Sequence, residues 1–228
     1  DLNILKKEII IKGNLTLEGQ LHIGSGETGI FGPDNPVEKT WMIEGDKTRI
    51  VPYIPGTTLK GVLRSEAEKI ARAIIETNEK KICVPPNTCS KCVICGIFGG
   101  QKLAGHIIIR DAFPIGEYKI KTKPGIAIHR ITRTTIPGAL YIIETVQPKA
   151  KFSFTMIIKN IDLDLNKNPE EHKDLRAKIL RYLIQKLENG EIQIGGKRTC
   201  GMGTIKLEIQ KVEVLTPEKI KEELGVKQ

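Results

Sequence analysis

The sequence predicts an α+β protein with a ferredoxin-like (RRM-like) core. Strand and helix patterns follow one another along the 228 residues in the order strand, helix, strands, helix, strand, with long insertions between them. Apolar residues recur at intervals of three and four in the helix patterns and alternate in the strand patterns. Aromatic residues make up only 4% of the chain, so a base-stacking RNA-recognition domain is not expected.

The composition indicates a basic protein that can form a core. Apolar residues make up 39% of the chain, charged residues 28%, and the net charge is +9 at pH 7. This charge favours a polyanion as partner, although a basic surface that binds nothing would have the same composition. No apolar run approaches the ~20 residues of a membrane span, and no signal-peptide pattern is present. We therefore expect a cytoplasmic protein with no membrane partner.

The first strand is expected from Glu8 to Leu17, with Gly13 as a possible bulge. A glycine-rich loop over residues 24–29 leads from it to the sequence Gly-Pro-Asp-Asn-Pro at residues 32–36. Each proline fixes its own φ, and the second one also keeps the preceding residue out of helical geometry. Asp34 is therefore predicted to lie on a stiff loop, which suits a carboxylate that must be aimed.

The first helix is expected from about Thr58 to Thr77, after a connection that can form a hairpin around residues 44–46. Lys60 and Arg64 lie four residues apart in its first turns and share a face. Cations are electrostatically unfavourable at the N-terminus of a helix. A bound anion such as a phosphate would resolve this conflict, whereas a solvated charged face is the alternative.

Four of the five cysteines lie close together, at Cys83, Cys89, Cys92 and Cys95. In a cytosolic chain this clustering favours a metal site over disulfides. Four thiolates would close a tetrahedral Zn²⁺ site with no open position, so we expect a structural zinc that orders its segment. His106 is an alternative fourth ligand should Cys83 lie outside the site, and four free thiols are the other possibility.

A strand is expected over residues 105–113, followed by a basic β-hairpin between residues 114 and 147 with a turn at Pro137-Gly138. Arg130 and Arg133 in this hairpin are candidate contacts for a polyanion. The alternative is an edge hairpin that its lysines protect from aggregation, which accounts for the lysines better than for the arginines.

The last third of the chain predicts a strand over 152–159, a second helix from Asn168 to Glu188, and a final strand over 204–214. Asn168, Pro169 and Glu171 together form a capping-box pattern for the start of that helix. A short C-terminal helix is expected from Pro217.

A second glycine-rich loop spans residues 194–203 and contains Lys197 and Arg198. It is not a Walker A loop, because Met-Gly stands where Lys-Ser or Lys-Thr is required. Its glycines would still let backbone N–H groups approach a phosphate beside the two cations. A plain tight connection is the alternative.

Several motifs occur in order over nearly the whole chain: Leu21-His22-Ile23-Gly24, Asp34-Asn35-Pro36-Val37, Ile54-Pro55-Gly56-x-x-Leu59-Lys60-Gly61-x-x-Arg64, Cys95-x-x-Phe98-Gly99, Arg110-Asp111-Ala112 and the late glycine loop. This set resembles the RAMP superfamily of CRISPR proteins, and within it the backbone subunits of type III-A (Csm) interference complexes. The resemblance implies one domain over residues 1–228, a ferredoxin-like palm with two insertions. These are a zinc-binding lid at about 78–104 and a projecting β-hairpin thumb at about 114–148.

The resemblance also implies a function. Copies would form a filament on a guide CRISPR RNA with other Csm subunits, and cut complementary target RNA with Mg²⁺ or Mn²⁺. Asp34 stands at the position of the catalytic carboxylate, while His22, Lys60 and Arg64 stand at positions associated with RNA binding. Arg130 and Thr132 match part of the thumb motif, but Arg133-Thr134-Thr135 follows where a glycine is expected.

Two other functions compete with target cleavage. The chain could be a non-catalytic binding module in which Asp34 only shapes its loop. It could also be a metal-independent RNA-processing nuclease that uses His22 or His129 as general acid or base.

Overall fold

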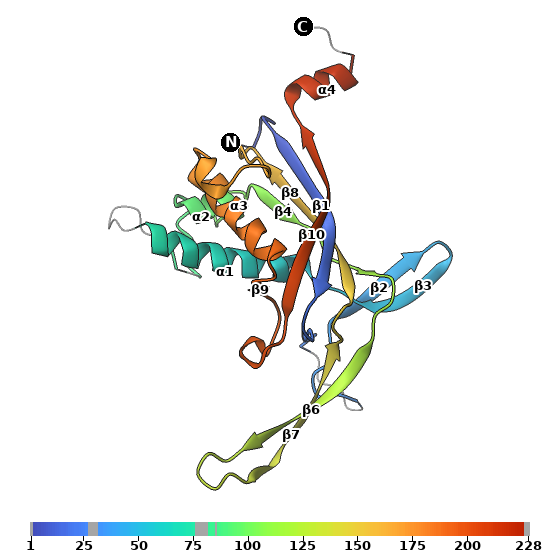
Figure 1. Ribbon diagram of the computed structural model, residues 1–228. Coiled ribbons are helices and arrows are strands. Elements are labelled where there is room, and N and C mark those ends of the chain that lie inside the picture. The colour runs from blue at the N-terminus through green and yellow to red at the C-terminus, as the bar shows by residue number, and fades with distance from the viewer. Residues whose placement is uncertain (1, 27–31, 76–81, 85, 226–228) are drawn as a thin grey trace.

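The computed structural model describes residues 2–26, 32–75, 82–84 and 86–225. Its centre is an antiparallel sheet with the strand order β4-β8-β1-β10-β9, in which β5 also pairs with β8 (Figure 1). The sheet strands are β1 (Glu8–Leu17), β4 (Ile107–Ile109), β5 (Pro114–Ile115), β8 (Lys151–Lys159), β9 (Ile192–Gln193) and β10 (Thr204–Leu215). The predicted mixture of helices with an antiparallel sheet is confirmed.

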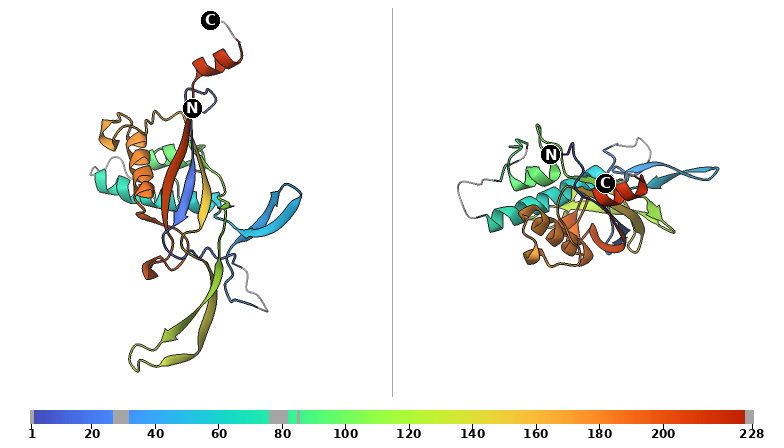
Figure 2. Two further views of the ribbon diagram at one scale, coloured as in Figure 1. Left: turned by 45° about the vertical axis from the view of Figure 1, so that its right-hand side comes forward. Right: turned by 90° about the horizontal axis from the view of Figure 1, so that it is seen from above.

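Three helices, α1 (Gly56–Ile74), α2 (Val93–Phe98) and α3 (Leu175–Glu188), lie on one side of this sheet (Figures 1 and 2). The apolar stripes of α1 and α3 and the inward residues of β1 form one buried core. A fourth helix, α4 (Pro217–Glu223), extends away from the body and has no buried residue. No helix in the described part of the chain is long and apolar enough to cross a membrane.

Strand β1 follows the predicted alternation, with Ile9, Ile11, Leu15 and Leu17 buried and Gly13 at an irregularity of the ladder. The register with β10 shifts between Lys12 and Gly13. A Cβ on Gly13 would lie 2.3 Å from the carbonyl oxygen of Glu208, so only glycine allows the two backbones to approach this closely.

Two hairpins project beyond the central sheet (Figures 1 and 2). One consists of β2 (Lys39–Glu44) and β3 (Lys47–Pro52), and its two-residue turn lies at Gly45-Asp46 as predicted. Gly45 has φ of +58°, which suits this kind of turn. The other consists of β6 (Ile120–Ile128) and β7 (Thr135–Val146).

The prediction that Pro137-Gly138 turns the second hairpin is wrong. The turn lies over residues 129–134, where the His129 N–H donates to the Thr134 carbonyl oxygen at 2.8 Å. Pro137-Gly138 lies inside β7, where the register with β6 shifts. A proline without an N–H and a glycine with φ of +76° suit a bulge as well as they suit a turn.

Three predicted boundaries also differ. The capping box at Asn168 is present, but it caps only a short 3₁₀ turn (Pro169–Glu171), and α3 begins at Leu175 with Asp174 as its N-cap. The strand predicted over 105–113 is shorter in the structure, where β4 spans only Ile107–Ile109. Farther along the chain, Ala112 pairs with Ile54, just before α1, instead of continuing that strand. Helix α1 begins at Gly56 rather than Thr58 and ends at Ile74, because Ile75 is extended; the predicted end at Thr77 lies outside the described residues.

Candidate functional site

The Asp34 loop lies along the edge of β7 that faces away from β6. The Asn35 N–H donates to the Ile142 carbonyl oxygen at 3.2 Å, and the Glu144 N–H donates to the Asn35 carbonyl oxygen at 3.0 Å. The Ile142 N–H donates to Asp34 Oδ2 at 2.6 Å. Asp34 is therefore held by a strand as well as by the two prolines.

The register of the hairpin leaves this edge open. Ile142 stands opposite Pro124 of β6 in a pair whose main-chain groups point away from each other. Its own N–H and carbonyl group both bond to the Asp34 loop instead. The Asp34 side chain is exposed, and its Oδ1 atom makes no hydrogen bond to the residues that the structure describes. One carboxylate oxygen is thus fixed and the other is available.

Glu144 organises the same loop, although no sequence motif predicts this role. Its carboxylate accepts the Val37 N–H at 3.1 Å and pairs with Lys39 at 2.9 Å. Its carbonyl oxygen accepts a hydrogen bond from His22 Nδ1 at 2.8 Å. Partners more than 100 residues apart in the sequence leave no local signal.

His22 is buried between β7 and the second glycine loop, with only 5% of its surface exposed. The Gly196 N–H donates to the His22 carbonyl oxygen at 2.8 Å. A Cβ on Gly195, whose φ is +76°, would lie 2.3 Å from the same oxygen. This glycine loop therefore packs onto His22. Because the imidazole also bonds to Glu144, His22 connects the glycine loop to β7.

Lys197 brings a cation to the same strand. Its Nζ donates to Tyr141 Oη at 3.0 Å and lies 4.6 Å from the centre of the Tyr141 ring. The hydrogen bond to Tyr141 raises the pKa of Lys197. A hollow of about 120 Å³ lies beside this pair, and Lys123, Cys200 and Met202 are among the residues that line it. Arg198 is exposed next to it. Asp34, His22 and Lys197 thus all bond to residues 141–144 of β7.

Lys60 and Arg64 lie elsewhere, on α1. The anion expected at the start of this helix comes from the chain itself, because Asp111 Oδ1 accepts the Gly56 N–H at 2.7 Å. Burial, and then the charge of Arg64, lowers the pKa of Lys60. Arg64 faces the cysteine segment, where its Nη1 donates to the Gly99 carbonyl oxygen at 2.9 Å.

Arg130 and Arg133 are exposed at the tip of the β6–β7 hairpin. Arg133 adopts a left-handed conformation with φ of +58°, and its N–H donates to the His129 carbonyl oxygen at 2.8 Å. His129 Nδ1 accepts the Thr132 N–H at 3.2 Å, so this imidazole helps to shape the turn. Figure 1 places this tip at the far end of the hairpin from the central sheet.

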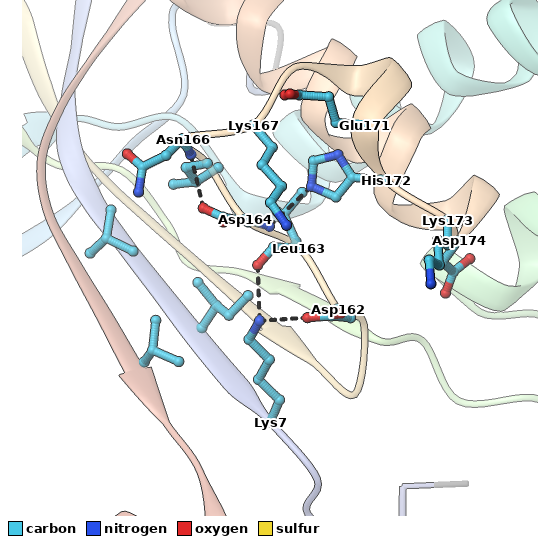
Figure 3. A pocket seen from close by; sticks show the side chains of 14 residues that line it. Lys7, Asp162, Leu163, Asp164, Asn166, Lys167, Glu171, His172, Lys173 and Asp174 are labelled. Atoms are coloured by element: carbon cyan, nitrogen blue, oxygen red, sulfur yellow. Dashed lines mark hydrogen bonds and ion pairs between the residues drawn. The ribbon is translucent and has the colours of Figure 1, made fainter.

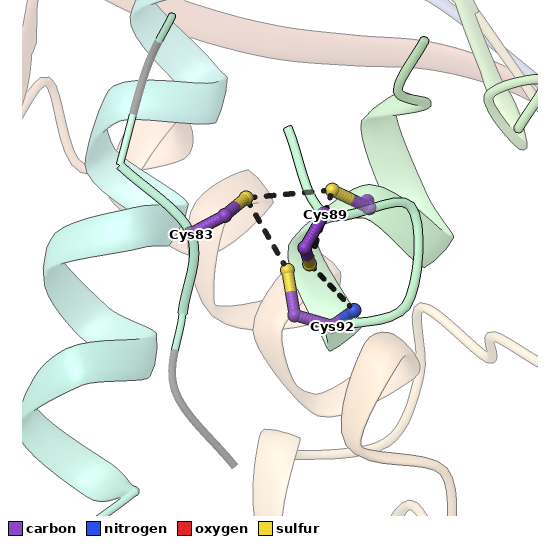
Figure 4. Close-up of side chains that lie close together, drawn as sticks. Cys83, Cys89 and Cys92 are labelled. Atoms are coloured by element: carbon purple, nitrogen blue, oxygen red, sulfur yellow. Dashed lines mark hydrogen bonds between the residues drawn. The ribbon is translucent and has the colours of Figure 1, made fainter. Parts of the chain in front are cut away.

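The four cysteines form one cluster (Figure 4). Cys83 Sγ lies 3.7 Å from Cys92 Sγ and 3.5 Å from Cys95 Sγ, and all four sulfur atoms lie within 4.8 Å of one another. A Zn–S bond of about 2.3 Å gives tetrahedral S–S edges of about 3.8 Å, so the cluster fits a bound Zn²⁺. The alternative ligand His106 is not among the residues whose ligand atoms gather here, and its Nδ1 donates to the Lys159 carbonyl oxygen at 2.8 Å.

A cavity of about 700 Å³ lies away from these groups, between the ends of β1 and β10 and the segment before α3 (Figure 3). Lys7 at its wall pairs with Asp162 at 2.7 Å. Both ring nitrogens of the buried His172 are bonded, to the Asp164 N–H and to the Asn168 carbonyl oxygen. These polar groups satisfy one another, so the cavity offers no reactive arrangement.

Residues 14–206 match the RAMP superfamily. The chain belongs to this superfamily. The resemblance stated from the sequence motifs is therefore confirmed. The matched residues include Asp34, the cysteine cluster, both sides of the β6–β7 hairpin and the second glycine loop.

Similar RAMP proteins include three that are named CRISPR system Cms endoribonuclease Csm3. The chain is 27% identical to that of Methanothermobacter thermautotrophicus over 96% of its own length and 91% of the relative's. It is 26% identical to those of Mycobacterium tuberculosis and Streptococcus thermophilus over 87% and 88% of its own length, and 86% and 87% of theirs. A cryo-EM structure of type III-B Cmr-beta in its apo state shares the fold, with a TM-score of 0.58 at 14% identity over 89% of this chain and 97% of the other.

Proposed function

We propose that this RAMP chain is a guide-RNA-binding backbone subunit of a type III-A interference complex, and that it cleaves complementary target RNA with a divalent metal. The observation that carries the proposal is the carboxylate of Asp34, which one oxygen fixes to Ile142 of β7, while Lys197 bonds to the neighbouring residue Tyr141. The relatives named endoribonuclease Csm3 align over nearly the whole chain, which supports the same reaction class.

The proposed architecture is one domain over residues 1–228. Element order and the strand order β4-β8-β1-β10, with α1 and α3 on one face, support a ferredoxin-like palm. In this proposal the projecting β6–β7 hairpin is the thumb. The cysteine segment is a lid held by structural Zn²⁺ on Cys83, Cys89, Cys92 and Cys95.

The proposed RNA surface combines cations from three places. Lys197 and Arg198 lie beside the Asp34 strand, Arg130 and Arg133 at the hairpin tip, and Lys60 on α1. They would contact phosphates, so binding would depend on salt more than on RNA sequence. His22 is too buried for direct contact and would hold the glycine loop against β7.

Cleavage would proceed by attack of a ribose 2′-hydroxyl on the adjacent phosphate, with a 2′,3′-cyclic phosphate and a 5′-hydroxyl as products. Asp34 Oδ1 would accept the hydroxyl proton or hold Mg²⁺ or Mn²⁺ together with the substrate phosphate. The ion, when bound, would stabilise negative charge that develops on the phosphate. The fixed Oδ2 contact would limit the carboxylate to orientations close to that of the reaction.

The test is a cleavage assay on the reconstituted complex with guide RNA and labelled target RNA. We expect cuts at regular spacing in Mg²⁺ or Mn²⁺ and none in EDTA. A complex that binds target RNA but does not cut it in either metal would support the non-catalytic binding module. Cutting of precursor RNA by the isolated chain in EDTA would favour the processing nuclease, and then variants of His22 and His129 should be compared.

A further inference from the structure

Helix α1 carries three charged residues at successive turns on one side, namely Arg64, Glu68 and Arg72. Arg64 Nε donates to Glu68 Oε1 at 3.1 Å, and Arg72 Nη2 lies 3.4 Å from Glu68 Oε2. Glu68 is only 6% exposed. A buried carboxylate is costly unless it is paired, so the two arginines account for its presence.

The two arginines also reach both ends of the cysteine segment. Arg64 Nη2 lies 3.9 Å from Cys95 Sγ, and its Nη1 donates to the Gly99 carbonyl oxygen. Arg72 Nη2 donates to the Cys83 carbonyl oxygen at 3.2 Å. Cys83 and Cys95, the first and last of the four cysteines, are thus both tied to the same row of side chains.

We propose that Arg64 and Arg72, held by Glu68, are positioning residues of the metal centre. Zn²⁺ with four thiolates carries a net charge of −2, and the row Arg64–Glu68–Arg72, with a net charge of +1, would offset part of that charge. Hydrogen bonds to a metal ligand and to the carbonyl groups around it orient the ligands before the metal arrives. The proposal rests on the zinc site proposed above, but not on RNA cleavage.

The same contacts give Arg64 a role other than phosphate binding. Each of its three guanidinium nitrogens has a partner within the chain, on Glu68, Gly99 or Cys95. Three of its five N–H donors are thus used within the chain, which turns the guanidinium group toward the metal centre. Arg64 therefore couples α1, which also carries Lys60, to the metal centre.

The test measures metal affinity and ligand geometry rather than activity. Full-length wild-type and Arg64→Met proteins are titrated with Zn²⁺ against a chromogenic chelator, and their Co²⁺ forms are compared by absorption spectroscopy. We expect the variant to bind Zn²⁺ about 10- to 100-fold more weakly and to show altered Co²⁺ bands. Arg72→Met should have a smaller effect in the same direction, since Arg72 is more exposed.

Arg181 supplies a matched control. It also lies on a helix, pairs with a carboxylate at 3.0 Å and donates to a main-chain carbonyl oxygen, with a side-chain exposure of 15% against 20% for Arg64. Its partners, Glu188 and Lys167, are not part of the cysteine segment. Arg181→Met should therefore bind Zn²⁺ like the wild type, even if it melts at a lower temperature.

Four results would overturn the assignment. The first is an Arg64→Met protein whose zinc affinity and Co²⁺ spectrum equal those of the wild type. The second is an Arg181→Met protein that loses as much zinc affinity as Arg64→Met. Weaker RNA binding by Arg64→Met with unchanged zinc affinity would return Arg64 to the RNA surface. If Arg64→Met does not fold, Arg72→Met and Glu68→Gln are judged by the same two measurements. A wild-type protein that takes up neither metal would refute the metal centre itself, and RNA cleavage would stand or fall separately.

Discussion

Asp34 shows how one residue can have a structural and a chemical role that substitution separates. An asparagine can still accept the Ile142 N–H through its side-chain oxygen, but it carries no charge and is a poor base. We therefore expect Asp34→Asn to bind RNA and assemble like the wild type. Its target-RNA cleavage should fall at least about a hundredfold, on the order of 2.7 kcal/mol of transition-state stabilisation. Single-turnover cleavage by the reconstituted complex in Mg²⁺ is the measurement.

Asp46→Asn is the control for that experiment, because it removes one exposed carboxylate in the β2–β3 turn. It should cut at the wild-type rate. Wild-type cleavage by the Asp34→Asn complex would show that the residue only shapes its loop.

Asp174 is a residue whose effect should be confined to stability. Its Oδ1 accepts the Arg176 N–H at 2.8 Å at the start of α3. Burial opposes its charge, but the hydrogen bonds and charge of Arg176 prevail and lower its pKa. A carboxyl group whose pKa is lower in the folded state stabilises that state fully at pH above its unfolded-state pKa. This stabilisation is lost as the pH falls through the folded-state pKa. Asp174→Ala should lower the free energy of unfolding by about 1 kcal/mol at pH 7 in urea titrations.

The difference between Asp174→Ala and the wild type should then shrink as the pH falls below about 4. A difference that stays constant down to pH 2 would mean that the carboxylate charge plays no part. Asn168→Ala, which removes the cap of a single 3₁₀ turn, should cost less.

At the scale of elements, the cysteine segment should depend on its metal. Burial raises the pKa of Cys95 to about 12, whereas backbone N–H donors lower the pKa of Cys89 to about 6. We expect one Zn²⁺ per chain by elemental analysis. Chelation or Cys83→Ser should lower the melting temperature and make residues 82–104 sensitive to protease. A zinc-free protein with four freely titratable thiols would contradict this.

The glycine loop and the hairpin tip should contribute separately to RNA binding. Replacing Lys197 and Arg198 with Ala should flatten the plot of log affinity against log salt by about 1.4, at about 0.7 per single-strand phosphate contact. Replacing Arg130 and Arg133 should do the same independently, since the two sites lie on different elements. Equilibrium binding at four salt concentrations measures both slopes. An unchanged slope in either variant would show that this pair of cations is solvated and does not contact RNA phosphates.

The structure also shows which elements could be predicted from the sequence. Local signals sufficed for β1, for the body of α1, for the β2–β3 turn and for the cysteine cluster, because each depends on neighbours in the chain. Pro137-Gly138 predicts a turn but lies at a bulge, because a bulge and a turn suit the same two residue types. The Asn168 capping box was recognised, but capping chemistry does not determine how far a helix continues.

The candidate site was harder to predict for a different reason. Asp34 was found because two prolines flank it, but its partner Ile142 lies 108 residues away. Asp111, which lies 55 residues away, accepts the Gly56 N–H at the start of α1, a contact that no local pattern predicts. Only the folded chain brings such partners together.

At the scale of the whole molecule, the proposed function predicts assembly along RNA. A net charge of +9 keeps copies apart in the absence of a polyanion. Adding single-stranded RNA should therefore produce oligomers whose mass rises with RNA length, as light scattering after size exclusion would measure. If one chain binds per RNA molecule whatever the RNA length, the filament is contradicted, although RNA binding by a single copy is not.

The β2–β3 hairpin has a practical consequence for spectroscopy. Trp41, the single tryptophan of the chain, is 66% exposed on this hairpin, opposite Ile50. Its emission should already be red-shifted and open to acrylamide quenching in the native protein, so it would change little on unfolding. A blue shift of that emission would instead report that another surface has covered the hairpin, which gives the chain an intrinsic fluorophore for assembly rather than for folding.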